Sequence, residues 1–240
     1  MPAVCTHPST SNLPDLTGSL AIVIDLLRAS TTITYALAAG AAAIAPCESI
    51  EAARERATRF PPGTCLLGGE RRGVRIEGFD LGNSPTEYTP TVVHGKTIIF
   101  TTTNGTVAIH RAEPARRILI GCFANLSAVT AAARDSGLPI NIICAGIHGQ
   151  ASREDTICAG ALAAHLSTLG LDVTGPDALH AIDIYKSIPK TFDGLAAALL
   201  KTEGGQNLLA EHLEFDVPTC AAIDSQRTVP EWIAADRLIR

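Results

Sequence analysis

Five carboxylate side chains lie in or beside loops that should follow buried strands. Asp25 and Glu70 each end an apolar run, Asp80 lies in the loop after Glu70, and Glu154 and Asp155 come shortly after a third run at 139–146. Mg²⁺ takes oxygen ligands and commonly uses one or two protein carboxylates together with a substrate phosphate. If these acids share one pocket with a bound anion, they indicate a magnesium-assisted reaction on a phosphorylated substrate.

Two hydroxyl-rich stretches could bind the oxygen atoms of such an anion. Residues 28–32 read RASTT and residues 101–106 read TTTNGT. Unpaired N–H groups at a helix start, with nearby hydroxyls, bind anions, although N-capping alone explains either stretch taken singly. Two stretches in one chain, one of them beside an arginine, favour an anion site. Its expected members are Arg28, Ser30, Thr31, Thr103, Asn104, Gly105 and Thr106.

The polar loop GFDLGNSPTE, at 78–87, allows a structural and a functional interpretation. Its last four residues, 84–87, fit a capping box, with a hydroxyl N-cap, then proline, and glutamate three residues on. A tight turn would account for the glycines alone. These explanations leave Asp80 and Asn83 without a role. We therefore expect Asn83 and Ser84 to close over the anion site.

The sequence gives weaker support for cysteine, aspartyl-phosphate and histidine mechanisms. Cys65 and Arg71 have the C-x₅-R spacing of cysteine phosphatases, but residues 66–67 between them look like strand interior. Asp25 lacks the second aspartate, two residues later, that an aspartyl-phosphate enzyme of the haloacid dehalogenase type would need. His148 could donate a proton, although a lone loop histidine is usually only solvated. No HExxH, Gly-x₄-Gly-Lys-Ser/Thr or GxGxxG motif is present, so nucleotides are not indicated.

These side chains must be positioned by alternating strands and helices. Strands are expected at 19–28, 43–47, 64–70, 96–102, 116–123, 139–146 and 215–224. Helices are expected at 30–41, 49–60, 105–112, 125–137 and 154–169. This alternation predicts a layered α/β fold, in which sites form beyond the carboxyl ends of parallel strands. We expect one domain over 1–240, with two lobes as an alternative, and an irregular segment at 1–18.

Composition excludes several classes of protein. The net charge of −5 over 240 residues, without a long basic run, argues against nucleic-acid binding. No run approaches the roughly 18 apolar residues of a membrane span, and the start has no signal-peptide pattern. Seven cysteines without a CxxC pair indicate a reduced, cytoplasmic protein. As partners we expect a small anionic phosphorylated substrate, with a homodimer left open.

Four blocks together resemble the 2-phosphosulfolactate phosphatase (ComB-like) family: IVIDLLRASTTI, GGERRG with EGFDLGNSPTE, TTTNGT, and CAG with SREDTICAG. They occur in the family's order within 20–160, and DVPTCAAID resembles its ending, whereas IHGQ at 147–150 departs from its pattern. The resemblance implies an α/β/α layered fold with a largely parallel or mixed central sheet. It also implies Mg²⁺-dependent hydrolysis of 2-phospho-3-sulfolactate to 3-sulfolactate and phosphate, a step toward coenzyme M in methanogens. Bacteria that do not make coenzyme M have homologues, so the pathway does not follow.

The resulting hypothesis assigns Mg²⁺ to Asp25, Glu70 and Asp155, directly or through water. Arg28 and the hydroxyl-rich stretches would bind the phosphoryl group while water attacks in line. A covalent intermediate on Asp25 and a capping role for Asp155 remain alternatives. So do a Mg²⁺-assisted lyase or enolising enzyme and a non-catalytic sensor of phosphorylated acids. The arginines placed to balance substrate charge are Arg28, Arg71, Arg72, Arg75 and Arg153.

Overall fold

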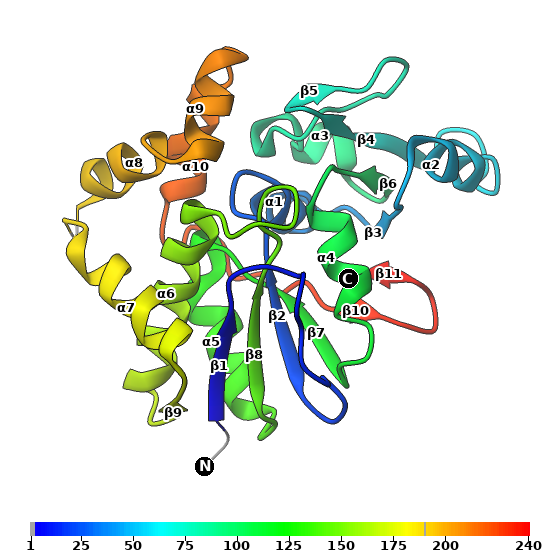
Figure 1. The fold of residues 1–240 in the computed structure, drawn as a ribbon. Helices are drawn as coiled ribbons and strands as arrows, with labels where there is room; N and C mark the ends of the chain where they lie inside the picture. Colours follow the sequence, from blue (N-terminus) through cyan, green and yellow to red (C-terminus); the bar gives the residue numbers. More distant parts are fainter. Residues whose placement is uncertain (1–2, 190) are drawn as a thin grey trace.

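The computed structural model describes residues 3–189 and 191–240, which form two β-sheets with helices around and between them (Figure 1). The first sheet has five strands, all parallel. In spatial order these strands are β7 (Arg117–Ile120), β2 (Leu20–Ile24), β8 (Ile140–Cys144), β1 (Ala3–His7) and β9 (Asp172–Val173).

The second sheet has six strands and is mixed. Its order is β10 (Trp232–Ile233), β11 (Leu238–Ile239), β3 (Ala43–Pro46), β6 (Thr97–Thr101), β4 (Cys65–Arg71) and β5 (Val74–Arg75). The three central strands β3, β6 and β4 are parallel, and antiparallel pairs extend the sheet at both edges. The α/β class is therefore confirmed, with two sheets where the sequence predicted a single central one.

Ten α-helices and three short 3₁₀ helices complete the described part of the chain. The α-helices are α1 (Ala29–Ala38), α2 (Ile50–Ala57), α3 (Pro90–Val93), α4 (Gly105–Arg111), α5 (Leu126–Asp135), α6 (Arg153–Thr168), α7 (Pro176–Ser187), α8 (Phe192–Leu200), α9 (Glu203–Ala210) and α10 (Val217–Ala221). The 3₁₀ helices are η1 (Pro85–Glu87), η2 (Phe123–Asn125) and η3 (Glu214–Asp216). Among the helices of the described residues, none has the length and apolar character needed to cross a membrane.

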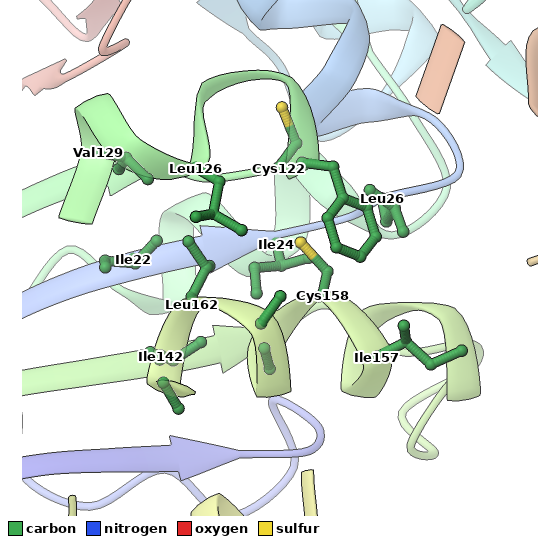
Figure 2. Packing of buried hydrophobic residues seen from close by; sticks show 14 of the residues in the cluster. Ile22, Ile24, Leu26, Cys122, Leu126, Val129, Ile142, Ile157, Cys158 and Leu162 are labelled. Atoms are coloured by element: carbon green, nitrogen blue, oxygen red, sulfur yellow. The ribbon is translucent and has the colours of Figure 1, made fainter. Parts of the chain in front are cut away.

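Strand β2 is buried on both faces, as its uninterrupted apolar run predicts. On one face, Ile22 and Ile24 pack with Leu162 and Cys158 of α6, as Figure 2 shows. On the other face, Val23 contributes to a second cluster that also contains residues of α1, α4 and the second sheet. Helices α1 and α4 therefore lie between the two sheets. This arrangement holds the carboxyl end of β2 against the second sheet.

Two expected elements are wrong. The segment 1–18 is not irregular throughout, because β1 pairs with β8 and β9 inside the parallel sheet. Its short alternation, with Val4 and Thr6 buried and their neighbours half-buried, is easily missed among polar flanks. The stretch 215–224 does not form a strand. It contains η3 and α10, and Pro218 occupies a first-turn position where a missing N–H costs no helical hydrogen bond.

Candidate active site

A cavity of about 460 Å³ lies where the carboxyl ends of the two sheets meet. Asp25 follows β2 and Gly146 follows β8 of the first sheet, whereas Glu70 ends β4 and Asn104 follows β6 of the second. All four line the same cavity. The polar clusters that the sequence places after four different strands are thus brought together, across two sheets.

Asp25 lies at the floor of this cavity. Burial raises the pKa of Asp25 well above its usual value, and repulsion from Asp155 and Glu70 raises it further. A hydrogen bond from the Ala29 backbone offsets part of this effect. A Cβ atom built on Gly105 would lie 2.7 Å from Asp25 Oδ2, so only glycine fits there without displacement. The charged form of Asp25 is therefore costly unless a cation compensates it.

Asp155 and Glu154 begin helix α6, and both are buried. Asp155 accepts hydrogen bonds from the backbone N–H groups of Leu26, at 2.8 Å, and Gly146, at 3.0 Å. These bonds tie the loops after β2 and β8 together. Burial, and then repulsion from Glu154, raise the pKa of Asp155 to about 7. The carboxylate of Asp155 thus has a structural role, and its charged form is disfavoured by burial and by Glu154.

Glu70 is held by backbone groups of two neighbouring loops. Its Oε1 accepts a hydrogen bond from the Thr103 N–H at 2.8 Å, and its Oε2 accepts one from the Gly73 N–H at 2.7 Å. The side chain is 7% exposed. Glu70 therefore fixes the loop after β6 and the tip of the β4–β5 hairpin at the cavity.

Arg28 forms a buried ion pair that the sequence analysis did not predict. Its Nη1 donates to Asp216 Oδ2 at 2.6 Å, and its Nη2 donates to the Gly73 carbonyl at 2.6 Å. Ser84 Oγ donates to the other oxygen of Asp216 at 2.5 Å. Asp216 thus joins the C-terminal region to Arg28 and to the 78–87 loop. Its only sequence signal is its place in the stretch that resembles the family's ending.

Five of the expected anion-binding residues do not line the cavity. These residues instead form hydrogen bonds or close contacts within the fold. Ser30 Oγ accepts from the Asp25 N–H, and Thr31 donates to the Leu26 carbonyl. Ser84 donates to Asp216, and Gly105 makes room for Asp25, as described above. Thr106 donates to the Thr102 carbonyl at 3.1 Å. The residues concerned are Ser30, Thr31, Ser84, Gly105 and Thr106.

The remaining expected residues do line the cavity: Asp25, Arg28, Glu70, Asn83, Thr103, Asn104 and Asp155. Asn83 is fixed from behind, because Thr32 Oγ1 donates to its carbonyl at 2.8 Å. The sequence analysis missed the opposite wall, which α9 supplies through Gly204, Asn207, Leu208, Ala210 and the following Glu211. No local motif marks these residues as parts of a site.

The donor set of the cavity fits a hard cation such as Mg²⁺. Asn83 Oδ1 and Glu154 Oε2 are buried without a hydrogen-bond partner, and both residues line the cavity. Asp25 and Asp155 add carboxylates that repel each other. However, within residues 3–189 and 191–240 no three His, Cys, Asp or Glu side chains form a preassembled metal cluster. Because Glu70 and Asp155 already accept backbone hydrogen bonds, water-mediated contacts to the ion suit them best.

The cysteine-phosphatase pattern finds no support in the geometry. Cys65 begins β4, whereas Glu70 lies at the end of β4 that reaches the cavity, and Cys65 does not line that cavity. Burial raises the pKa of the Cys65 thiol, which opposes a nucleophilic thiolate. Arg71 donates to the Glu70 carbonyl and to Thr101 Oγ1, so its guanidinium is engaged away from the cavity.

Known proteins resemble this chain over nearly its whole length. A family model described as 2-phosphosulpholactate phosphatase matches residues 5–234. A protein of Symbiobacterium thermophilum is 40% identical over 227 residues, covering 91% of this chain and 94% of its own. A protein of Gloeobacter violaceus is 36% identical over 230 residues, covering 95% and 94% respectively. Both are named probable 2-phosphosulfolactate phosphatase. Since the family match spans nearly the whole chain, this protein belongs to the 2-phosphosulpholactate phosphatase family.

Proposed function

We propose that this protein is a Mg²⁺-dependent phosphatase that hydrolyses 2-phospho-3-sulfolactate, or a related 2-hydroxy-acid phosphate, to the hydroxy acid and phosphate. The observation that supports it most directly is the shared cavity of Asp25, Glu70, Asp155 and Arg28. Surplus carboxylates would repel a phosphate ester, unless a divalent cation lies between them. The names of the relatives support the choice of substrate.

Asp25, Glu70 and Asp155 are the residues we assign to the metal, with water between the ion and the last two. Asn83 Oδ1 and Glu154 Oε2 are further oxygen atoms without a partner. When bound, Mg²⁺ supplies charge neutralisation for the phosphoryl oxygens and a site for an ordered water. Loss of phosphate release on removal of the ion by a chelator, and in Asp25→Asn, would support this assignment.

The protein's own groups position the ester for attack. Arg28 keeps N–H groups beyond the two that it donates to Asp216 and Gly73, and its place in the cavity lets these donate to phosphoryl oxygens. Thr103 and Asn104 line the cavity from the loop that Glu70 holds. Fixed donors of this kind stabilise charge that develops in the transition state without reorganisation.

Asp25 is the group we assign to accept the proton of the attacking water at its carboxylate. Its position after the central strand β2 and its buried environment hold it at the floor of the cavity. The alternative is attack by Asp25 itself on phosphorus. A phosphate ester made chiral with oxygen isotopes separates the two routes. Direct hydrolysis inverts the configuration at phosphorus in its single displacement, whereas two successive displacements through a covalent intermediate on Asp25 retain it.

The proposal is tested by measuring phosphate release from a series of 2-hydroxy-acid phosphate esters, with Mg²⁺ and with chelator. We expect release that requires the metal and is lost in Asp25→Asn. Cleavage of the carbon skeleton without free phosphate would indicate a lyase, and binding without turnover would indicate a sensor. Metal-independent release that Cys65→Ser abolishes would support the cysteine mechanism instead.

A further inference from the structure

Two similar turns border the cavity, one from each sheet. In the β4–β5 hairpin, Arg71 pairs with Val74, so Arg72 and Gly73 form a two-residue turn. After β8, Ile147 and Gln150 exchange backbone hydrogen bonds of 2.9 Å in both directions, which encloses His148 and Gly149 in the same way. Arg72, Gly73 and His148 line the cavity.

The first residue of each turn is unusual for its backbone conformation. Arg72 has φ of 54° and His148 has φ of 50°, while the glycines that follow have φ of 82° and 79°. Two-residue turns with positive φ at both positions favour Asn-Gly or Asp-Gly, because a longer side chain is strained in the left-handed region. Strained residues of this kind cluster at ligand-binding sites. The requirements of the turns therefore do not explain why arginine and histidine occupy these positions.

Each turn is also fixed to the floor of the site by its backbone. The Gly73 N–H donates to Glu70, and the Gly73 carbonyl accepts from Arg28. The loop that leads to the second turn is fixed by the Gly146 N–H, which donates to Asp155. The side chains of Arg72 and His148 are thus presented at the cavity by rigid backbone.

The distribution of charge distinguishes these two side chains from the rest of the cavity. Glu70, Glu154 and Asp155 are buried and Asp25 is half-buried, whereas Arg72 and His148, like the acid Glu211, are exposed. Arg28 is already paired with Asp216. In the part of the chain that the structure describes, neither Arg72 nor His148 has a hydrogen bond or an ion pair. Of the five arginines expected to balance substrate charge, only Arg28 and Arg72 line the cavity.

We infer that Arg72 and His148 determine specificity by binding the anionic groups of the substrate that are not phosphate, namely its carboxylate and sulfonate. This inference rests on the proposed function, because it assumes that the phosphoryl end occupies the acidic floor with the metal. The planar guanidinium of Arg72 matches an oxyanion in geometry, and the imidazole of His148 donates a further hydrogen bond. Esters that carry a second and third acid group would be selected over simple phosphate esters.

The test uses Arg72→Asn and His148→Asn, because asparagine before glycine suits these turns and should leave stability equal or higher. KM and kcat are measured for 2-phospho-3-sulfolactate and for p-nitrophenyl phosphate, which carries no other acid. We expect each variant to raise KM for the first ester about tenfold, the loss typical of one charged hydrogen bond. Its kcat, and KM for p-nitrophenyl phosphate, should stay within about twofold of the wild-type values.

Matched controls are Arg237→Asn and His212→Asn. These residues also have positive φ, 51° and 58°, but do not line the cavity, so their replacement should leave both KM values unchanged. An equal rise of KM for both esters, or no rise, would overturn the inference while leaving the phosphatase proposal intact.

A readout that needs no turnover separates the two proposals further. Binding of 3-sulfolactate by calorimetry should weaken about tenfold in Arg72→Asn and His148→Asn and stay unchanged in the controls. If the wild-type protein released no phosphate from any ester, the proposed function would fail. The effect of the two turn variants on 3-sulfolactate binding would then be the test of the inference. Unchanged binding of 3-sulfolactate in both turn variants would reject it.

Discussion

Arg28 and Asp216 are 188 positions apart in the chain, yet Arg28 Nη1 and Asp216 Oδ2 lie 2.6 Å apart in a buried ion pair. Their side chains are 2% and 0% exposed. The pair joins the start of α1 to η3, and Ser84 adds the 78–87 loop. The orientation of Arg28 in the cavity therefore depends on a residue that the sequence analysis did not place in the site.

Replacing Asp216 by asparagine should therefore impair both stability and activity. The buried Arg28 would lose its counter-charge, which costs about 3 kcal/mol in the free energy of unfolding. Misplacement of the guanidinium should lower kcat/KM about 100-fold. Urea unfolding and phosphate release measure the two effects. The control is Glu231→Gln, which breaks the half-exposed Arg117–Glu231 pair and should cost less than about 1 kcal/mol. Equal losses in both variants would contradict this reasoning.

Asp25→Asn should stabilise the metal-free protein while it removes activity. At pH 7.5 the substitution removes a buried group whose charged form is disfavoured by burial and by Asp155. We expect a higher melting temperature together with a kcat about 100- to 1000-fold lower. Asp15→Asn is the control, because hydrogen bonds from Thr17 lower the pKa of exposed Asp15, so its loss should not stabilise. A lower melting temperature for Asp25→Asn would show that its carboxylate is stabilising.

The same carboxylates should make stability depend on pH. The pKa values of Asp25 and Asp155 are raised in the folded protein, the latter to about 7, so the folded state binds these protons more tightly than the unfolded chain. This contribution is complete below about pH 4, the usual pKa of aspartate, and is lost as pH rises through about 7. The metal-free protein should thus unfold at lower urea concentration at pH 7.5 than at pH 5.

Mg²⁺ should reverse that loss. Adding the ion should raise the urea midpoint at pH 7.5, where the carboxylates must ionise, and change it little at pH 5. Asp25→Asn should show a smaller response to the ion at pH 7.5. Equal stabilisation by Mg²⁺ at both pH values would indicate binding elsewhere on the protein.

Gly105→Ala tests the close approach between α4 and Asp25. The new Cβ would lie 2.7 Å from Asp25 Oδ2 and 2.8 Å from Ala29 Cβ. Alanine is favoured over glycine in helices by about 1 kcal/mol, yet we expect a net destabilisation of about 1 to 3 kcal/mol and reduced kcat. Gly137→Ala, with φ of 67° and no atom within 4 Å of the new Cβ, should destabilise without lowering kcat.

Six of the seven expected strands are present, because an apolar run marks a buried strand locally, whereas β1 and the short edge strands were not predicted. The carboxyl ends of four of those six strands also converge on one cavity, as expected. The apolar run that becomes β2 is buried on both faces, and Asp25, Glu70 and Asn104 do share a cavity. Burial of an apolar run and the meeting of parallel strands at one edge are general consequences of α/β packing.

Long-range polar pairing could not be predicted in the same way. The hydroxyls of Thr31 and Thr32 have the types expected of an anion site, but they donate to the carbonyls of Leu26 and Asn83 inside the fold. Asp216 has no local neighbour that marks it, since its partners lie in segments more than 100 positions away. Such pairings depend on how the two sheets pack against each other, and that packing cannot be deduced from residue spacing.

The dependence of Arg28 on Asp216 also bears on the order in which the molecule becomes functional. Every residue that lines the cavity precedes residue 216, but a chain that stops short of Asp216 buries the Arg28 guanidinium without its anion. During synthesis, the catalytic centre would then be complete only after the segment that contains Asp216 has been made and has folded. A chain that ends between Glu211 and Asp216 should be inactive even where the parallel sheet and every cavity-lining residue are present.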